Sequence, residues 1–140
     1  MLSEDRGTVL MLFPAAFLVM IVLGALVVDV SLSQVRATEL DAVAASAAND
    51  ALAALDLQTL RATGEALIEP DDAARIAEES IANGPLPDAR LVAVSVDYGG
   101  GVPVLSVTLE LEVDFVMAPA LPNGLDSTTI TRTKSVSILG

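Results

Sequence analysis

The residues best suited to chemistry are carboxylates at alternate positions: Glu110, Glu112 and Asp114. Paired carboxylates can act as general acid and base when their surroundings shift one pKa away from the other. On a strand, however, residues two apart share one face, and apolar residues occupy the intervening positions here. The pattern therefore predicts the solvated face of an antiparallel sheet, and we expect no catalytic pair in this acidic row.

Two further combinations could carry chemistry. Asp71 and Asp72 follow Pro70, where acids complement the dipole of a helix start, and no further ligands are spaced for calcium. Lys134 lies beside Ser135, but no Ser-x-x-Lys spacing or nucleophile elbow occurs. The chain also lacks Cys and His, which removes thiolate chemistry and the commonest general base. We predict no catalytic residue, no cofactor and no metal site.

An apolar run from Thr8 to Val28 contains no charged side chain. As a helix it would be about 31 Å long, close to the hydrocarbon thickness of a bilayer. A buried core helix in a small domain would need a polar face, and a signal peptide has a shorter apolar region. We therefore predict an uncleaved transmembrane helix over residues 8–28, preceded by a leader over residues 1–7.

The charges divide unevenly around this run. Arg6 precedes it, Asp29 follows it, and all but two of the 19 acidic residues come after Val28. Because positive residues favour the cytoplasmic flank, we expect the N-terminus inside the cell and an extracytoplasmic α+β domain over residues 29–140. The net charge of −12 argues against nucleic acid as a partner and against docking on anionic lipid.

The helical pattern continues beyond the apolar run. Apolar residues recur at i, i+3, i+4 and i+7 spacing, and residues 29–63 contain no Pro or Gly. We predict one helix from about Thr8 to Thr63, ended by Gly64, with its first half in lipid and its second half against a domain. Small residues permit close helix packing. The predicted helix-packing residues are Gly24, Ala25, Val43, Ala47 and Ala51.

In the rest of the chain, the spacing of the apolar residues changes from the helical period to alternation. Pro70 opens a second short helix, and from Arg90 to Met117 apolar residues alternate around a Gly-rich turn, which predicts a β-hairpin. A Thr- and Ser-rich tail predicts a third strand, on which Arg132 and Lys134 would pair with the acidic row. The predicted fold class is α+β: a long N-terminal helix, transmembrane then amphipathic, a second short helix, and an antiparallel sheet of about three strands packed on the long helix.

This order of elements resembles a type IV pilin-like subunit, and more narrowly the TadE/TadG-like proteins of the Flp (tight-adherence) pilus system. The stretch EDRGTVLMLFPAAFLVMIVLGALVVDVS is similar to the family's opening of Arg-Gly, small residue, long apolar run and acid. The stretch VRATELDAVAASAANDALA is similar to its Arg-then-acid, alanine-rich helix. Together they cover about the first 55 residues, and the β-rich remainder matches in general character.

The resemblance implies a non-enzymatic, single-pass protein of the bacterial inner membrane that assists pilus assembly or secretion. Its implied partners are the lipid bilayer, other pilus or secretion membrane subunits and a prepilin peptidase, which would cut between Gly7 and Thr8. The sequence departs from pilins at the fifth residue after that bond, where Leu12 replaces Glu. Two alternatives stay open: a bitopic, membrane-anchored binding or scaffold domain unrelated to pili, and an anchored hydrolase.

Overall fold

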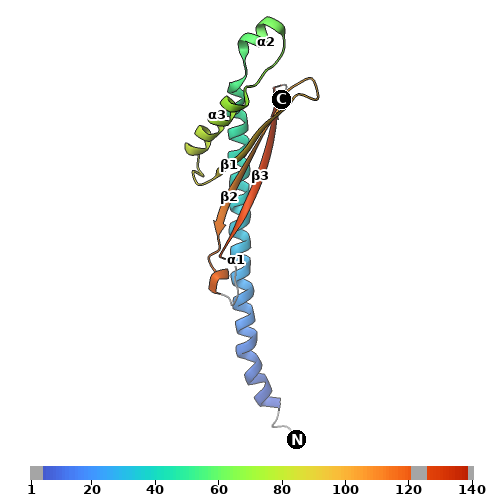
Figure 1. Cartoon of the computed structure of the whole chain (residues 1–140). Coiled ribbons are helices and arrows are strands. Elements are labelled where there is room, and N and C mark those ends of the chain that lie inside the picture. The colour runs from blue at the N-terminus through green and yellow to red at the C-terminus, as the bar shows by residue number, and fades with distance from the viewer. Residues whose placement is uncertain (1–4, 121–125, 139–140) are drawn as a thin grey trace. The chain divides into compact units, whose positions relative to one another are not determined.

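Figure 1 shows the chain as a computed structural model that describes residues 5–120 and 126–138. The side chains of residues 5–11 and of Ala120 lie outside that description. The helices are α1 (Asp5–Ala51), α2 (Leu57–Thr63) and α3 (Pro70–Ala82), with 3-10 turns η1 (Leu52–Ala54) and η2 (Ala118–Ala120). The strands are β1 (Arg90–Asp97), β2 (Val104–Asp114) and β3 (Ser127–Ser137). The predicted α+β class is confirmed.

The chain divides into two compact units. The first unit contains Met1–Gln34 and Asp114–Thr128, and the second contains Val35–Val113 and Thr129–Gly140. Helix α1 contributes its first part to one unit and its later part to the other. The first unit is therefore an apolar helix with a loop, and the second is the helix–sheet domain.

The prediction of one helix as far as Thr63 is wrong, because α1 ends at Ala51. Leu55 has extended backbone angles and forms an isolated antiparallel bridge with Ile68, which is buried. The Asp56 side chain then accepts hydrogen bonds from the backbone N–H groups of Gln58 and Thr59, and so caps the separate helix α2. Gly64 ends α2 in the left-handed conformation, at φ 78°.

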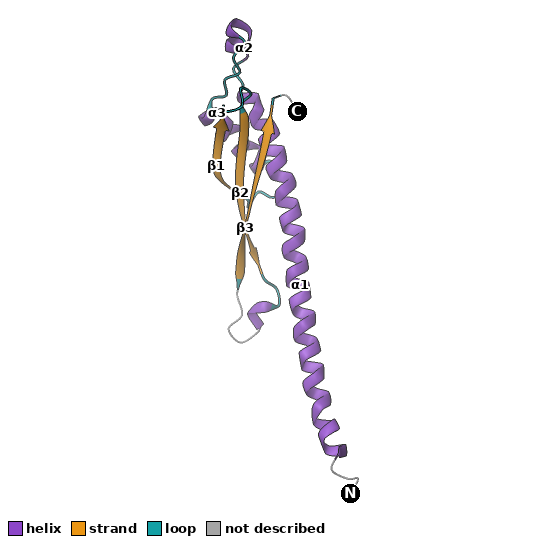
Figure 2. Cartoon of the chain, turned by 90° about the vertical axis from the view of Figure 1, so that its right-hand side faces the viewer, coloured by secondary structure: helices purple, strands orange, loops and turns teal. Residues whose placement is uncertain are grey.

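The three strands form one sheet in the order β1-β2-β3 (Figure 2). β1 and β2 form the predicted hairpin, antiparallel from the pair Arg90–Glu110 to the pair Asp97–Val104. The register shifts between Leu91 and Ala93, so Val92 is the extra residue of a β-bulge and is 50% exposed. The sheet packs on the later part of α1 within the second unit.

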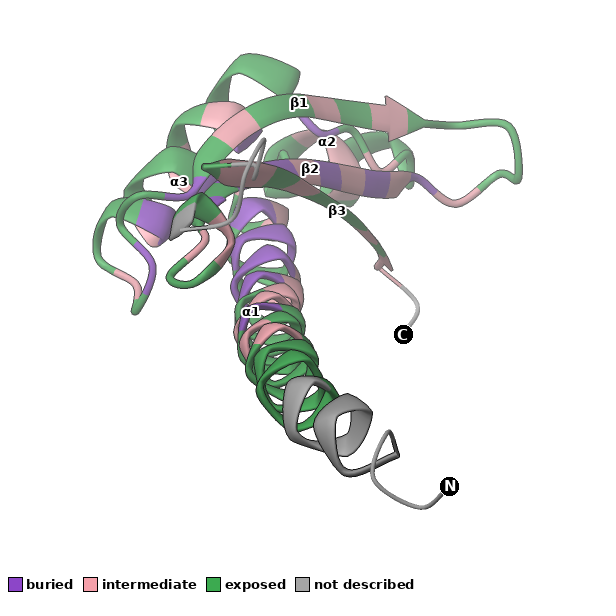
Figure 3. Cartoon of the chain, turned by 90° about the horizontal axis from the view of Figure 1, so that it is seen from below, coloured by how far each residue is buried: buried purple, intermediate pink, exposed green. Residues whose placement is uncertain are grey.

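The core of the second unit joins an alanine-rich face of α1 to one face of β2. Figure 3 shows buried bands on both elements. The buried residues of α1 are Leu40, Val43, Ala44, Ala47, Ala48 and Ala51, and those of β2 are Leu105, Val107, Leu109, Leu111 and Val113. The predicted alternation holds along β2 but was extended too far, because the strand ends at Asp114 and Met117 is 43% exposed.

Helix α3 begins at the predicted Pro70 and buries Ala73, Ala77 and Ile81. It contacts β1 and η1. The Ser80 hydroxyl also donates to Asp50 Oδ2 at 2.6 Å, which ties α3 to α1. Helix α3 therefore covers the same core beside the edge strand β1.

Candidate functional site

The first part of α1 exposes apolar side chains. Phe13 is 76% exposed and Met20 is 73% exposed, and the helix continues through Pro14. By length and composition it is apolar enough to cross a membrane, and it is the one such helix in the part of the chain that the structure describes. Large apolar side chains exposed along a helix usually mark contact with lipid or protein.

Asp29, the first charged residue after the apolar run, is held by three consecutive backbone N–H groups of the segment that follows β2. The N–H of Val116 donates to Asp29 Oδ1 at 2.9 Å, and that of Ala118 donates to Oδ2 at 2.7 Å. The N–H of Met117 lies between them, 3.1 Å from Oδ1 and 3.2 Å from Oδ2. We call these four residues the Asp29 cluster. Convergent N–H groups of this kind are a common way to hold an anion in proteins.

The Asp29 side chain is 3% exposed, and within the described residues it is the one charged side chain classed as buried. Burying a carboxylate is costly unless its oxygens accept hydrogen bonds, and both oxygens do so here. Desolvation raises the pKa of Asp29, and the three backbone hydrogen bonds lower it by more, so the pKa lies below its ordinary value. The carboxylate is therefore ionised at neutral pH.

The loop that carries the cluster is closed at its base. The N–H of Phe115 donates to the Asp126 carbonyl at 2.8 Å, which joins the two ends of the loop. On α1, the Ser33 hydroxyl donates to the Asp29 carbonyl at 2.9 Å. The Asp29 cluster thus attaches a closed loop to α1 at the residue where the apolar run ends, all within the first unit.

The predicted processing and packing residues lie in different surroundings. Gly7 and Thr8 fall inside α1, and their side chains lie outside the description. Gly24 is exposed, and a Cβ added to it would meet no atom within 4 Å, while Ala25 is half-buried. The other three predicted packing residues are buried in the core of the second unit: Val43, Ala47 and Ala51.

The cross-strand pairing predicted for Lys134 and the acidic row is wrong. Glu110 accepts a hydrogen bond from Arg90 of the neighbouring strand. Lys134 does not pair across the sheet as predicted, because its Nζ lies 2.8 Å from Asp41 Oδ2 on α1. Lys134 shares its side of β3 with Val136, which packs against the core, and this side faces the helix. Among the described residues, no group of three or more acidic side chains is placed to hold a metal ion.

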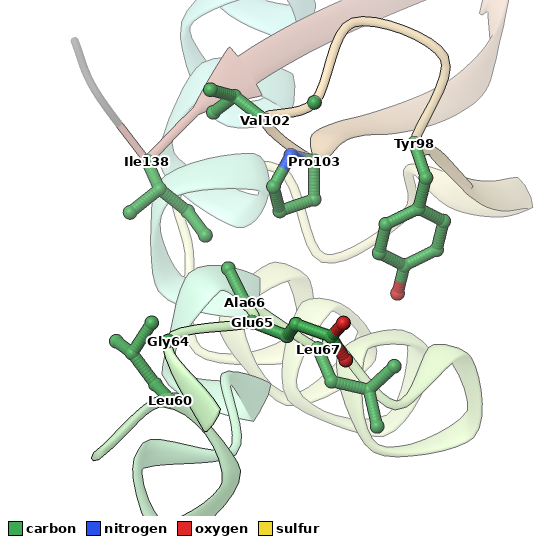
Figure 4. A pocket seen from close by; sticks show the side chains of 10 residues that line it. Leu60, Gly64, Glu65, Ala66, Leu67, Tyr98, Val102, Pro103 and Ile138 are labelled. Atoms are coloured by element: carbon green, nitrogen blue, oxygen red, sulfur yellow. The ribbon is translucent and has the colours of Figure 1, made fainter. Parts of the chain in front are cut away.

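A cavity of about 470 Å³ lies in the second unit beside α2 and the β1–β2 turn (Figure 4). Leu60 and Leu67 contribute to its largely apolar lining, and Glu65 is the acidic residue in it. The Tyr98 hydroxyl accepts from the Ile68 N–H at 3.2 Å and donates to the Ile68 carbonyl at 3.1 Å. Sequence reasoning missed this cavity because the break before α2 was not predicted.

Comparisons with known protein families, with curated proteins and with solved structures find no match to this chain. The class that the fold and the site define is an α+β protein with an N-terminal helix that could span a membrane. The Asp29 cluster and the cavity beside α2 are two features of the described residues that lie outside the apolar core.

Proposed function

We propose that this protein is a membrane-anchored, pilin-like (TadE/TadG-like) accessory subunit of Flp-type pilus assembly or related secretion machinery. The observation that carries the proposal is the single helix α1, whose first part exposes apolar side chains and whose later part packs under a three-stranded sheet. A long apolar helix that continues as an amphipathic helix and is followed by an antiparallel sheet is the order of elements on which the resemblance to pilin-like subunits rests.

In this proposal, residues 8–28 cross the bacterial inner membrane once, with the N-terminus in the cytoplasm and the α+β domain outside. The exposed apolar helix would contact other pilus or secretion membrane subunits, and the open surface at Gly24 suits close approach of a second helix. The protein would act by assembly and not by catalysis. A prepilin peptidase would remove the leader at the bond between Gly7 and Thr8.

Topology is tested with reporters fused after Gly140. A reporter that is active only outside the cytoplasm should be active, and one that is active only in the cytoplasm should be silent. The reverse result would refute the proposed orientation, because the domain would then lie inside the cell.

Processing is tested by determining the N-terminus of the native protein. We expect a chain that begins at Thr8, and we expect Gly7→Leu to abolish cleavage. Gly24→Leu is the matched control for cleavage alone, because it makes the same substitution on the same helix away from the bond between Gly7 and Thr8. A native chain that keeps Met1 would remove the pilin-maturation proposal and leave an anchored protein.

The cavity beside α2 favours a second candidate, a bitopic membrane-anchored binding or scaffold domain unrelated to pili. Its volume and apolar lining are within the range of small-molecule sites. The two candidates differ in their consequences: deletion of the gene should impair pilus formation or secretion only under the first. Neighbouring genes for a secretion ATPase and polytopic platform proteins would also favour the first candidate.

A further inference from the structure

The described part of the loop of the Asp29 cluster exposes apolar side chains, while hydrogen bonds to Asp29 fix the backbone of residues 116–118. Val116 is 62% exposed and Met117 is 43% exposed, and Pro119 next to them is exposed as well. Their N–H groups are not available to water, because those of Val116 and Met117 donate to Asp29. The loop therefore presents apolar side chains outward and uses its polar backbone inward.

The position of this loop along α1 follows from the hydrogen bonds. Asp29 comes directly after Val28, the last residue of the charge-free run. Hydrogen bonds of 2.7–3.2 Å keep the backbone of residues 116–118 beside that point of the helix. If the run spans the hydrocarbon, the loop lies at the level where hydrocarbon gives way to headgroups. Val30, on the other side of Asp29, is also 56% exposed at that level.

We propose that the loop of the Asp29 cluster is a second membrane contact, with Val116 and Met117 inserted into the interfacial region of the same bilayer that α1 crosses. The proposal rests on the membrane anchor of the proposed function, but not on its connection with pili. The Asp29 carboxylate holds the loop against α1 through its hydrogen bonds, and the side chains of Val116 and Met117 then face lipid.

The charges around the loop indicate an apolar contact and not a headgroup-binding one. Exposed Asp114 and Asp126 stand before and after it, and residues 12–34 and 114–128 include no Lys or Arg. Anionic headgroups attract basic segments, so such a loop would gain nothing from them. Apolar side chains that lie flat at the interface need no such charge.

The experiment uses the full chain, which contains no Cys, in phosphatidylcholine vesicles. Single variants Val116→Cys and Met117→Cys carry an environment-sensitive fluorophore, and quenching is measured with aqueous iodide and with nitroxide-labelled lipid. Both substitutions keep the backbone N–H that donates to Asp29. Leu23→Cys, 58% exposed within the apolar run, reports the anchor itself, and Asn49→Cys on exposed α1 surface reports water.

We expect both loop labels to be quenched by the lipid nitroxide and to show severalfold weaker iodide quenching than the label at position 49. Adding anionic lipid should not increase this protection. Full iodide access at both loop positions, with the label at position 23 protected by lipid, would overturn the inference and leave the anchor intact. Iodide access at position 23 would instead refute the anchor. Loop labels shielded from both quenchers would show that protein and not lipid covers the loop, which also overturns the inference.

Discussion

Ala47 provides the sharpest test of how α1 packs under the sheet. Its side chain is 0% exposed and lies in one buried cluster with the alanines of α1 and the aliphatic residues of β2. Ala47→Asp would place a carboxylate among these apolar side chains. Ala42→Asp is the matched control, because Ala42 lies on the exposed side of the same helix.

The two substitutions share one cost and differ in two others. Replacing Ala by Asp inside a helix costs about 0.7 kcal/mol, and this is the main term expected for Ala42→Asp. Ala47→Asp adds about 1–3 kcal/mol for overpacking and about 1–3 kcal/mol for an unpaired buried polar group, or about 3–7 kcal/mol in total. Because small domains have unfolding free energies of about 5–15 kcal/mol, the Ala47 variant should be marginally folded or unfolded.

The assay is urea denaturation of the full chain in mild detergent, with tyrosine fluorescence as the measure of unfolding. Tyr98 is the one Tyr and the chain has no Trp, so the signal comes from the second unit, where its hydroxyl bonds to Ile68. A difference between the Ala47 and Ala42 variants of less than about 1 kcal/mol would refute the packing of this helix face.

Four further predictions concern charged groups. Asp56→Ala should speed amide hydrogen exchange in Leu57–Thr63 and leave the core protected, because it removes the cap of α2. The Thr59 hydroxyl and two backbone N–H groups lower the pKa of Asp56, so this cap should hold above about pH 4 and be lost as the pH falls through the lowered pKa, with loss of protection in α2 as the measure. Lys134→Met breaks a partly exposed ion pair with Asp41 and should change the free energy of unfolding by less than about 1 kcal/mol in the tyrosine assay. Glu112→Gln, on the exposed side of β2, should change it by less than about 0.5 kcal/mol, and a much larger loss would show that the acidic row is coupled to the core.

The elements that could be predicted from the sequence are those whose burial follows one period over many residues. On β2, alternate residues from Leu105 to Val113 are buried as the period of two requires. On α1, the stripe from Leu40 to Ala51 follows the helical period. On the strand, a shift of one residue would move the whole apolar set to the exposed face, and on the helix it would turn the stripe by about 100° away from the sheet.

The predictions that failed depend on single residues and on distant partners. Helix propensity favours continuation past Ala51, but the pairing of Leu55 with Ile68 competes with it, and only the Asp at position 56 signals a new helix start. The bulge at Val92 cannot be read from the alternation, because an apolar residue stands at the exposed position. Lys134 was predicted to pair across the sheet, but α1 lies on its side of the sheet and supplies Asp41 as its partner.

The candidate site also depends on distant partners, and the sequence indicates them even less. In the sequence, Asp29 is only the charge that ends an apolar run, and nothing marks the N–H donors that lie 87 to 89 positions later. Those donors are backbone groups, so no side-chain type at Val116, Met117 or Ala118 could have indicated them. Yet the placement has a physical logic. A carboxylate at the end of a membrane-spanning helix must either face water or be fully hydrogen-bonded, and at Asp29 it is buried and hydrogen-bonded. In the proposed orientation, this one residue would set where the helix leaves the lipid and would hold a second apolar segment at the same level.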